Sequence, residues 1–328
     1  MTLINGLVGL RPADSEKMER ITAPPYDVIK KGSRLESLLE QNSESLYHIT
    51  LGDDPVGALN RLVNRGYLLP DEEPCFFVYE QQYGAQEIRT GVLAAVQVTD
   101  YREAEIIRHE KTFDEKVKGR LELRRKTGYT LEPVFLLTKS GIGDVLAKIK
   151  NTNQPIYDFV SNFEGESELH GIRNRIFRVK EDSAEVQLLK ELIKQGPLYI
   201  ADGHHRYHAS LLNGQTHCPA YICEVEAARI QAYNRVVNGR IPFRKVLSRL
   251  PLIKTERFMT PPKHHFAIYS KEGSFLLKAG HIPENDLIGR LDCSVLEREL
   301  YPLLGLSHDL IKDTRYFDYY PEQDMAKM

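Results

Sequence analysis

The sequence has no tryptophan and only four cysteines in 328 residues. The cysteines (Cys75, Cys218, Cys223 and Cys293) are scattered through a chain that is long enough to bury a sizeable core without disulfide bonds. No apolar run approaches the ~18–20 residues that span a bilayer, and the first residues lack the basic and apolar regions of a signal peptide. We therefore expect a cytoplasmic protein with reduced thiols.

The chain also lacks an excess of charge of either sign. Lysine and arginine number 44 against 46 acidic residues, for a net charge of −2, so we expect no nucleic acid and no membrane as partners. Three common motifs are missing, namely the GxxxxGK[ST] loop, the GxGxxG turn and the GxSxG elbow. A small-molecule substrate is the expected partner, and self-association as a homo-oligomer stays open.

Short apolar runs typical of strands and longer runs with helical spacing occur along the chain. Residues 75–81 and 89–99 read as two strands of an antiparallel hairpin. Helical spacing predicts helices at 33–40, 56–67, 114–126, 143–150 and 183–194. Because strands occur in hairpins as well as in strand–helix units, we predict an α+β protein with a mixed sheet and packed helices. The chain reads as one unit over 1–328, with subdomains expected at 1–100 and 101–328.

The most informative stretch is Asp202-Gly203-His204-His205-Arg206, which follows a short apolar strand. Gly203 can adopt a positive φ and allows close approach to the backbone. The first turn of the following helix presents N–H groups and a positive dipole end, to which the histidines and Arg206 add donors and charge. The pattern predicts a phosphate-binding corner. A plain Asp-Gly turn in which Asp202 caps the helix is the structural alternative.

A second polar cluster lies near the end of another predicted strand. It consists of Arg108, His109, Glu110, Lys111 and Thr112, with Arg120 farther along the chain. In a phosphoryl-transfer site the Glu110 carboxylate would orient an acceptor hydroxyl, accept its proton or hold Mg²⁺. The lysine and arginines would offset the charge of the transferring group. A solvated run of charges is the alternative interpretation.

Histidine spacing offers a third hypothesis. His204 and His208 stand at positions i and i+4 of the predicted helix, a spacing that allows two imidazoles to share one metal ion. No HExxH or CxxC pattern accompanies them, and a third ligand is unspecified. A metal-dependent hydrolase that uses this pair therefore stands as an alternative function.

Several short motifs occur together in a fixed order. They are Arg11-Pro12, 23–28 (APPYDV), 79–81 (YEQ), 89–91 (RTG), 109–112 (HEKT), 133–135 (PVF), 200–207 (IADGHHRY), 235–237 (RVV) and 291–296 (LDCSVL). Through them the chain resembles domain-of-unknown-function family 1015 over most of its length. It departs from that pattern at His208, where glutamate is expected, and at Asn234, where histidine is expected.

The box at 202–206 is similar to that of free serine kinases, which share the fold of ParB and sulfiredoxin. The resemblance implies a ParB/sulfiredoxin-like nucleotide-binding core that holds ATP or ADP with Mg²⁺. It implies that Gly203, His204, His205 and Arg206 hold the phosphates, together with Lys111, Arg108 and Arg120. Catalysis would involve Glu110, Asp202, His204 and His205, with Glu110 and Asp202 also as Mg²⁺ ligands. The substrate pocket would include Tyr26, Asp27, His109 and Thr112.

The implied reaction is phosphoryl transfer between a nucleotide and a small hydroxylated metabolite. Serine is the first candidate acceptor, and the reverse reaction would dephosphorylate phosphoserine. A non-enzymatic nucleotide-binding regulator is the second hypothesis, because the same corner would bind nucleotide without turnover.

Overall fold

A computed structural model describes the fold of the protein. It describes residues 3–26, 28–84, 87–109, 112, 114–163, 170–229, 233–257, 260–286, 288–313 and 315–321. The chain divides into two compact units, Met1–Ile230 and Gln231–Met328. Each unit has its own β-sheets and its own clusters of buried residues.

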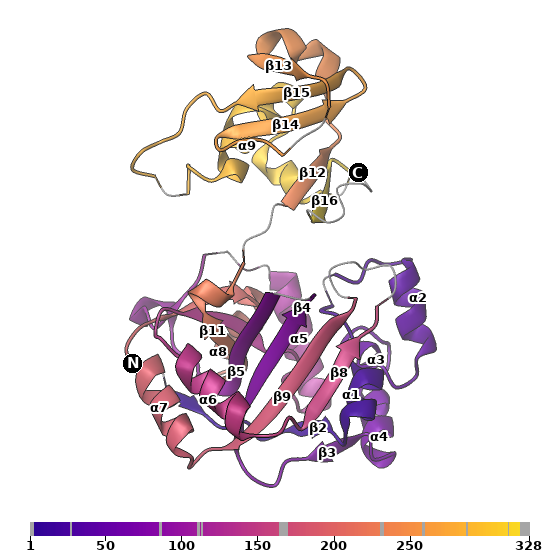
Figure 1. The fold of residues 1–328 in the computed structure, drawn as a ribbon. Helices are drawn as coiled ribbons and strands as arrows, with labels where there is room; N and C mark the ends of the chain where they lie inside the picture. The colour runs from indigo at the N-terminus through magenta and orange to yellow at the C-terminus, as the bar shows by residue number, and fades with distance from the viewer. Residues whose placement is uncertain are drawn as a thin grey trace. The chain divides into compact units, whose positions relative to one another are not determined.

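A mixed sheet forms the centre of the first unit (Figure 1). Its strands among the described residues are, in sheet order, β6 (Ile106–Ile107), β10 (Leu198–Asp202), β7 (Val134–Thr138), β11 (His217–Glu224), β5 (Glu87–Gln97), β4 (Cys75–Tyr83), β9 (Ile172–Lys180) and β8 (Tyr157–Ser161), with β1 (Ile4–Asn5) beside β5. The pairs β6–β10 and β7–β11 are parallel, and the other pairs are antiparallel. The predicted hairpin is present as β4–β5, and the predicted α+β class with a mixed sheet is confirmed.

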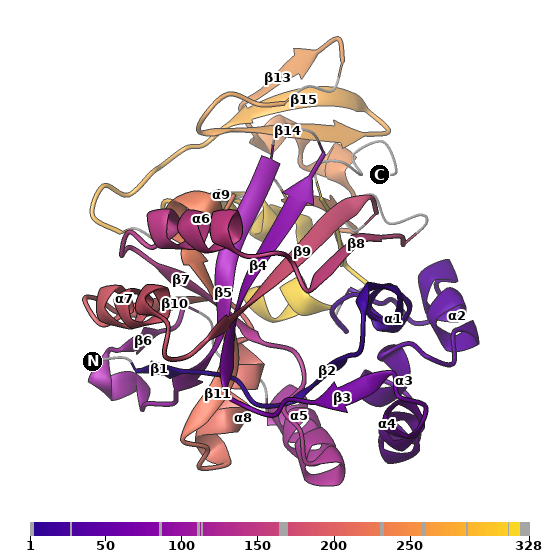
Figure 2. The ribbon, with the colours of Figure 1, turned by 60° about the horizontal axis from the view of Figure 1, so that its bottom comes forward.

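Helices cover the sheet of the first unit. They are α1 (Ser15–Ile21), α2 (Arg34–Gln41), α3 (Tyr47–Thr50), α4 (Pro55–Asn64), α5 (Asp114–Thr127), α6 (Gly143–Thr152), α7 (Ala184–Ile193) and α8 (His204–Leu212). The apolar stripes of α6 and α7 pack on one face of the sheet, where Ile149 and Leu189 are fully buried (Figure 2). Helices α1 to α4 gather beside β8, near a small ribbon of β2 (Leu10–Pro12) and β3 (Leu68–Pro70). All five predicted helices are present.

The expected subdomain boundary at residue 100 lies inside the first unit. Strands β4 and β5 belong to the first hundred residues, but β4 pairs with β9 and β5 pairs with β11. A boundary at residue 100 would separate β4 from β9 and β5 from β11, and would expose the backbone hydrogen-bonding groups of both pairs. The chain therefore divides at residue 230 instead.

The second unit contains two small antiparallel sheets. One joins β12 (Tyr233–Val237) to β16 (Phe317–Pro321), and the other has the order β13 (Leu252–Thr255), β15 (Gly273–Lys278), β14 (His265–Ser270). Helix α9 (Asp292–Glu299) buries Val295 against the three-stranded sheet. Phe317 of β16 packs edge to face on Tyr301 in a separate buried cluster. Among the described residues of the whole chain, no helix has both the length and the apolar content that crossing a bilayer requires.

Candidate active site

The turn between β10 and α8 has the predicted strand–turn–helix form. Gly203 lies at φ +91°, in the left-handed region, and a Cβ there would come within 3.0 Å of Nε of Arg206. Helices α2 and α7 are capped by Ser33 and Ser183, whereas no side chain among the described residues caps α8. Gly203 therefore offers no side-chain acceptor to the first turn of α8, and the same holds for the N-cap residues of α6 and α9.

Asp202 and Arg206 form an ion pair across this turn. Arg206 also donates from Nη1 to the carbonyl oxygen of Pro133, at 2.5 Å. Its side chain is only 10% exposed, whereas that of Asp202 is 59% exposed. Arg206 thus links β10, α8 and the residue before β7, and so has a structural role beside its predicted one as a phosphate ligand.

The second polar cluster lies beside this turn. Because β6 runs parallel to β10, with Ile107 opposite Tyr199, their carboxyl ends lie at the same edge of the sheet. The backbone N–H of His109 donates to Nε2 of His204 at 3.5 Å, and the two rings meet edge to face at 4.4 Å between centroids. Two motifs that are 95 residues apart in sequence therefore meet in space.

The rest of that cluster is only partly described. Glu110 and Lys111 lie outside the described residues, and Thr112 is half-buried. The guanidinium of Arg108 lies over the ring of Tyr101, at 4.1 Å from its centroid. Burial raises the pKa of Tyr101 to about 12, although Arg108 opposes the increase.

The two histidines of the metal hypothesis contact different groups. His204 packs on His109, whereas His208 stacks on Tyr101 with centroids 5.9 Å apart. Within the described ranges, no group of three or more His, Cys, Asp or Glu side chains is placed to hold a metal ion. The described geometry therefore supplies no metal site for a hydrolase.

Arg120 contacts two residues. One is Tyr26, which was also predicted for the site, and the other is Glu132, which sequence reasoning missed. Its guanidinium carbon lies 3.6 Å above the ring centroid of Tyr26, and Nη1 lies 3.6 Å from Oε2 of Glu132. The Arg120 and Glu132 side chains are 14% and 18% exposed. Asp27, predicted for the same pocket, lies outside the described residues.

Glu132 has a strained backbone. Its φ is +63° although it is not glycine, and it directly precedes Pro133, where helical conformations are disfavoured. Such strain is concentrated at functional sites. In the sequence, the one signal for Glu132 is a carboxylate placed immediately before a proline that leads into a buried strand.

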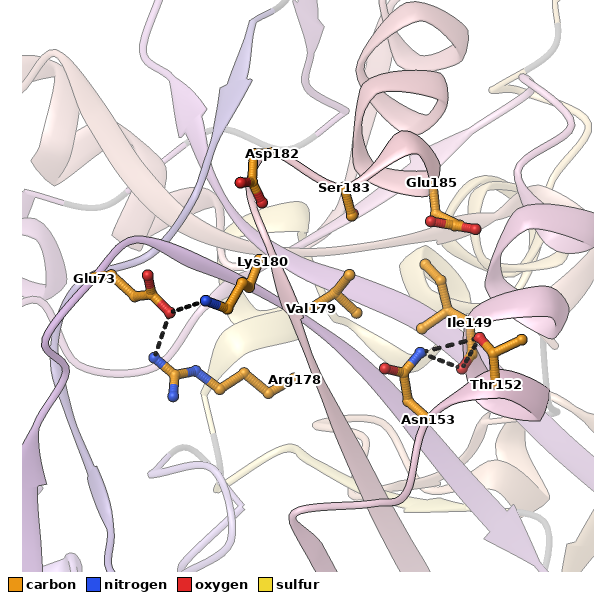
Figure 3. Close-up of a pocket in the computed structure, with 10 residues that line it drawn as sticks. All are labelled: Glu73, Ile149, Thr152, Asn153, Arg178, Val179, Lys180, Asp182, Ser183 and Glu185. Atoms are coloured by element: carbon orange, nitrogen blue, oxygen red, sulfur yellow. Dashed lines mark hydrogen bonds and ion pairs between the residues drawn. The ribbon is translucent and has the colours of Figure 1, made fainter.

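Two pockets lie among the described residues of the first unit. One of ≈ 550 Å³ lies beside β9 and the start of α7, where Glu73 pairs with Arg178 and Lys180 at 3.9 and 3.4 Å (Figure 3). Its lining contains none of the predicted site residues. The other, of ≈ 30 Å³, lies between α5 and α8 with Arg120 and Arg206 in its wall, and has room for about one water molecule.

Comparison with known proteins identifies a family but no function. The family described as "Protein of unknown function (DUF1015)" matches residues 4–294. No curated protein matches the chain. Among solved structures, a conserved hypothetical protein from Pyrococcus furiosus is similar over 75% of this chain and 76% of its own, with 14% sequence identity and a TM-score of 0.30. At that score the likeness carries no argument about fold or function.

Proposed function

The chain belongs to the DUF1015 family of proteins of unknown function, and we propose that it is a nucleotide-dependent phosphotransferase. Its acceptor would be a small hydroxylated metabolite, with free serine the first candidate, and the reverse reaction would dephosphorylate phosphoserine. The observation that carries the proposal is the contact of His109, from the second polar cluster, with His204, from the 202–206 turn, at one edge of the sheet.

In this proposal the turn binds the donor. The first-turn backbone of α8, from Gly203, would hold the nucleotide phosphates with His204 and His205, because a glycine start without a side-chain cap suits an anion. Arg206 would orient the turn through Asp202 and add positive charge. A ParB/sulfiredoxin-like core, which the resemblance implies, is part of the same proposal.

The opposite wall of the site would hold the acceptor and carry out proton transfer. Glu110 would accept the proton of the acceptor hydroxyl, and Lys111 and Arg108 would balance the charge that develops on the phosphoryl group. Tyr26, Asp27, His109 and Thr112 would contact the acceptor. Arg120, which stacks on Tyr26, brings a cation to that wall.

The metal part of the prediction has less support. Of the two predicted Mg²⁺ ligands, Asp202 is already paired with Arg206 and Glu110 lies outside the described residues. The described residues therefore do not by themselves form a magnesium site, and no step is assigned to a metal. The dependence on Mg²⁺ is left to measurement.

Phosphoserine formation tests the proposal. The full-length protein is incubated with serine and ATP or ADP, with Mg²⁺ in one arm and with EDTA in the other, and the products are followed by ³¹P NMR. The reverse reaction starts from phosphoserine. We expect phosphoserine to form with one of the two nucleotides. If no phosphate moves in either direction, the serine hypothesis is wrong.

A nucleotide-binding regulator is the second candidate, favoured by the ion pair that already occupies Asp202. Both functions predict that nucleotide raises the melting temperature, since a ligand of the native state stabilises it. The variant Glu110→Gln separates them, because it should abolish turnover in the enzyme while nucleotide affinity stays largely intact. Glu115→Gln, at an exposed carboxylate of α5, is the matched control and should change neither property.

A further inference from the structure

Two motifs of the sequence, 79–81 and 89–91, have no role in the site described above. They lie on β4 and β5, where Tyr79 pairs with Gly91 and Gln81 with Arg89. Alternate residues of a strand project to opposite faces of the sheet, and residues paired across strands share a face. Tyr79, Gln81, Arg89 and Gly91 therefore share one face, and we call this the Arg89 face.

The middle residues of both motifs belong to the other face. There Glu80, 3% exposed, accepts hydrogen bonds from Lys150, at 2.5 Å, and from Arg175. Thr90 Oγ1 accepts a further bond from Lys150 at 3.1 Å. The Glu80 carboxylate is thus shared by two cations, Lys150 and Arg175, so the polar groups of both motifs on the opposite face have structural partners.

Register places the predicted phosphate corner on the Arg89 face as well. Tyr221 is opposite Leu93 on β5 and opposite Phe135 on β7. Phe135 is in turn opposite Asp202 on β10, where the register shifts between Ile200 and Asp202. Gly91 lies two residues before Leu93, so this row of residues projects from the same face. Phe135 is thus the immediate neighbour of the 202–206 turn.

Arg89 is held rigidly above this row. Its guanidinium carbon lies 5.1, 5.9 and 5.4 Å from the ring centroids of Phe135, Tyr221 and Tyr83. Nη2 donates to Gln81 Oε1 and to the Tyr83 hydroxyl, each at 2.5 Å. Gln81 Oε1 also accepts from Nε, at 3.2 Å. A guanidinium fixed in this way loses little entropy when it binds a ligand.

Arg89 forms no ion pair with any described carboxylate, and Glu87, two residues before it on the same face, pairs with Arg229 instead. All its partners are neutral amides or aromatic groups, and no carboxylate within the described ranges forms an ion pair with it. Nη1 donates no hydrogen bond within the same ranges. The Arg89 side chain is half-buried, and a guanidinium presents its N–H groups as a fork that matches a carboxylate or a phosphate.

We propose that Arg89 binds an oxyanion of the small-molecule substrate, either a carboxylate or a phosphate group, on the face that also carries the 202–206 turn. This rests on the proposed function for the identity of the substrate. Gln81 and Tyr83 are positioning residues that fix the guanidinium, and Gly91 leaves space for the ring of Tyr221 that supports it.

Calorimetric titration with L-serine, serinamide and L-phosphoserine tests this proposal on the full-length protein. The variant Arg89→Gln should weaken binding of the anionic ligand by about 10- to 100-fold, the loss expected for hydrogen bonds to a charged group. The affinity for ATP should stay within about twofold. Arg173→Gln, on β9 and on the opposite face, is the matched control and should alter neither affinity.

The ligands distinguish the two sources of the oxyanion. If a carboxylate binds Arg89, serine binds and serinamide does not. If a phosphate binds, phosphoserine alone loses affinity in Arg89→Gln, and serine and serinamide behave alike. Gln81→Ala keeps the charge but frees the guanidinium, so we expect a smaller loss of affinity for the same ligand.

The outcomes separate this inference from the proposed function. If Arg89→Gln loses affinity for the anionic ligand but the wild type forms no phosphoserine, only the phosphotransferase function is refuted. Phosphoserine formation by Arg89→Gln at an unchanged KM overturns only the role of Arg89. Binding of ATP by a wild type that binds none of the three ligands overturns the role of Arg89 as well.

Discussion

Replacing Gly91 by alanine tests how β5 packs against β11. A Cβ at this position would lie 2.5 Å from the carbonyl oxygen of Ile222 and 2.6 Å from two ring carbons of Tyr221. Real Cβ atoms essentially never approach another atom closer than 3.0 Å. Because one of these contacts is to the backbone of the neighbouring strand, a side-chain rotation cannot relieve it. The backbone of β11 must therefore shift, and the ring of Tyr221 must move as well.

The expected cost follows from close packing. Adding a methyl group to a filled core costs about 1–3 kcal/mol, and each kcal/mol lowers the melting temperature of a unit of this size by about 2–4 °C. We therefore expect Gly91→Ala to lower the melting temperature of the first unit by about 2–12 °C in scanning calorimetry of the full-length protein. The displaced Tyr221 ring should also weaken oxyanion binding by Arg89.

Gly119 in α5 is the matched control. A Cβ there would meet no atom within 4 Å, and alanine is preferred to glycine in a helix by about 0.5–1 kcal/mol. Gly119→Ala should therefore raise the melting temperature while Gly91→Ala lowers it. Equal shifts of the same sign, or an unchanged Gly91→Ala, would refute the packing described for Tyr221.

Three further predictions concern a buried hydroxyl, a buried carboxylate and the exposure of the thiols. Tyr207→Phe removes a buried hydroxyl that binds both the N–H and the C=O of Thr99 at 2.9 Å, and should cost about 1–3 kcal/mol in urea denaturation. Burial acts to raise the pKa of Glu80, but its two cationic partners outweigh burial and lower the pKa. The stabilisation is thus present above the unfolded pKa of ~4.3 and is lost as the pH falls through the lower folded value, so Glu80→Gln should lower the melting temperature at pH 7 and less so in acid. Cys293 is the one exposed thiol of the four, and burial raises the pKa of Cys218 to about 12. Ellman's reagent should therefore titrate one thiol in the native protein at pH 8 and four after unfolding.

Local signals in the sequence were sufficient for most elements of the first unit. Ser33 and Ser183 cap the helices that their positions predict. Each hydroxyl accepts a hydrogen bond from the backbone N–H three residues farther along the chain, at Glu36 and Val186. The hairpin of β4 and β5 follows from two apolar runs and the short turn between them. Strand β8 was missed although its burial alternates, because its exposed positions are Asp158 and Val160 and its last buried position is Ser161, so apolar and polar residues do not alternate in the sequence.

Long-range pairing was beyond local signals. Strand β6 has only two residues, and its parallel register with β10 joins segments that are more than 90 residues apart. That register brings His109 to His204, and no spacing in the sequence encodes it. The same limitation explains the domain boundary, since the pairing of β5 with β11 across the first unit cannot be read from composition near residue 100.

Arg206 and Arg89 show that a sequence motif can indicate where a site lies without indicating which of its residues bind a ligand. Arg206 has the motif of a phosphate ligand, yet it has an acidic partner in Asp202 and an acceptor in Pro133 and is nearly buried. Arg89 was given no role, yet it is fixed by neutral partners and forms no ion pair with a described carboxylate. Substitution of Arg206 should therefore damage the turn whether or not a ligand binds there, whereas substitution of Arg89 should change affinity more than stability. The charge balance around each guanidinium, which depends on tertiary contacts, separates the two roles.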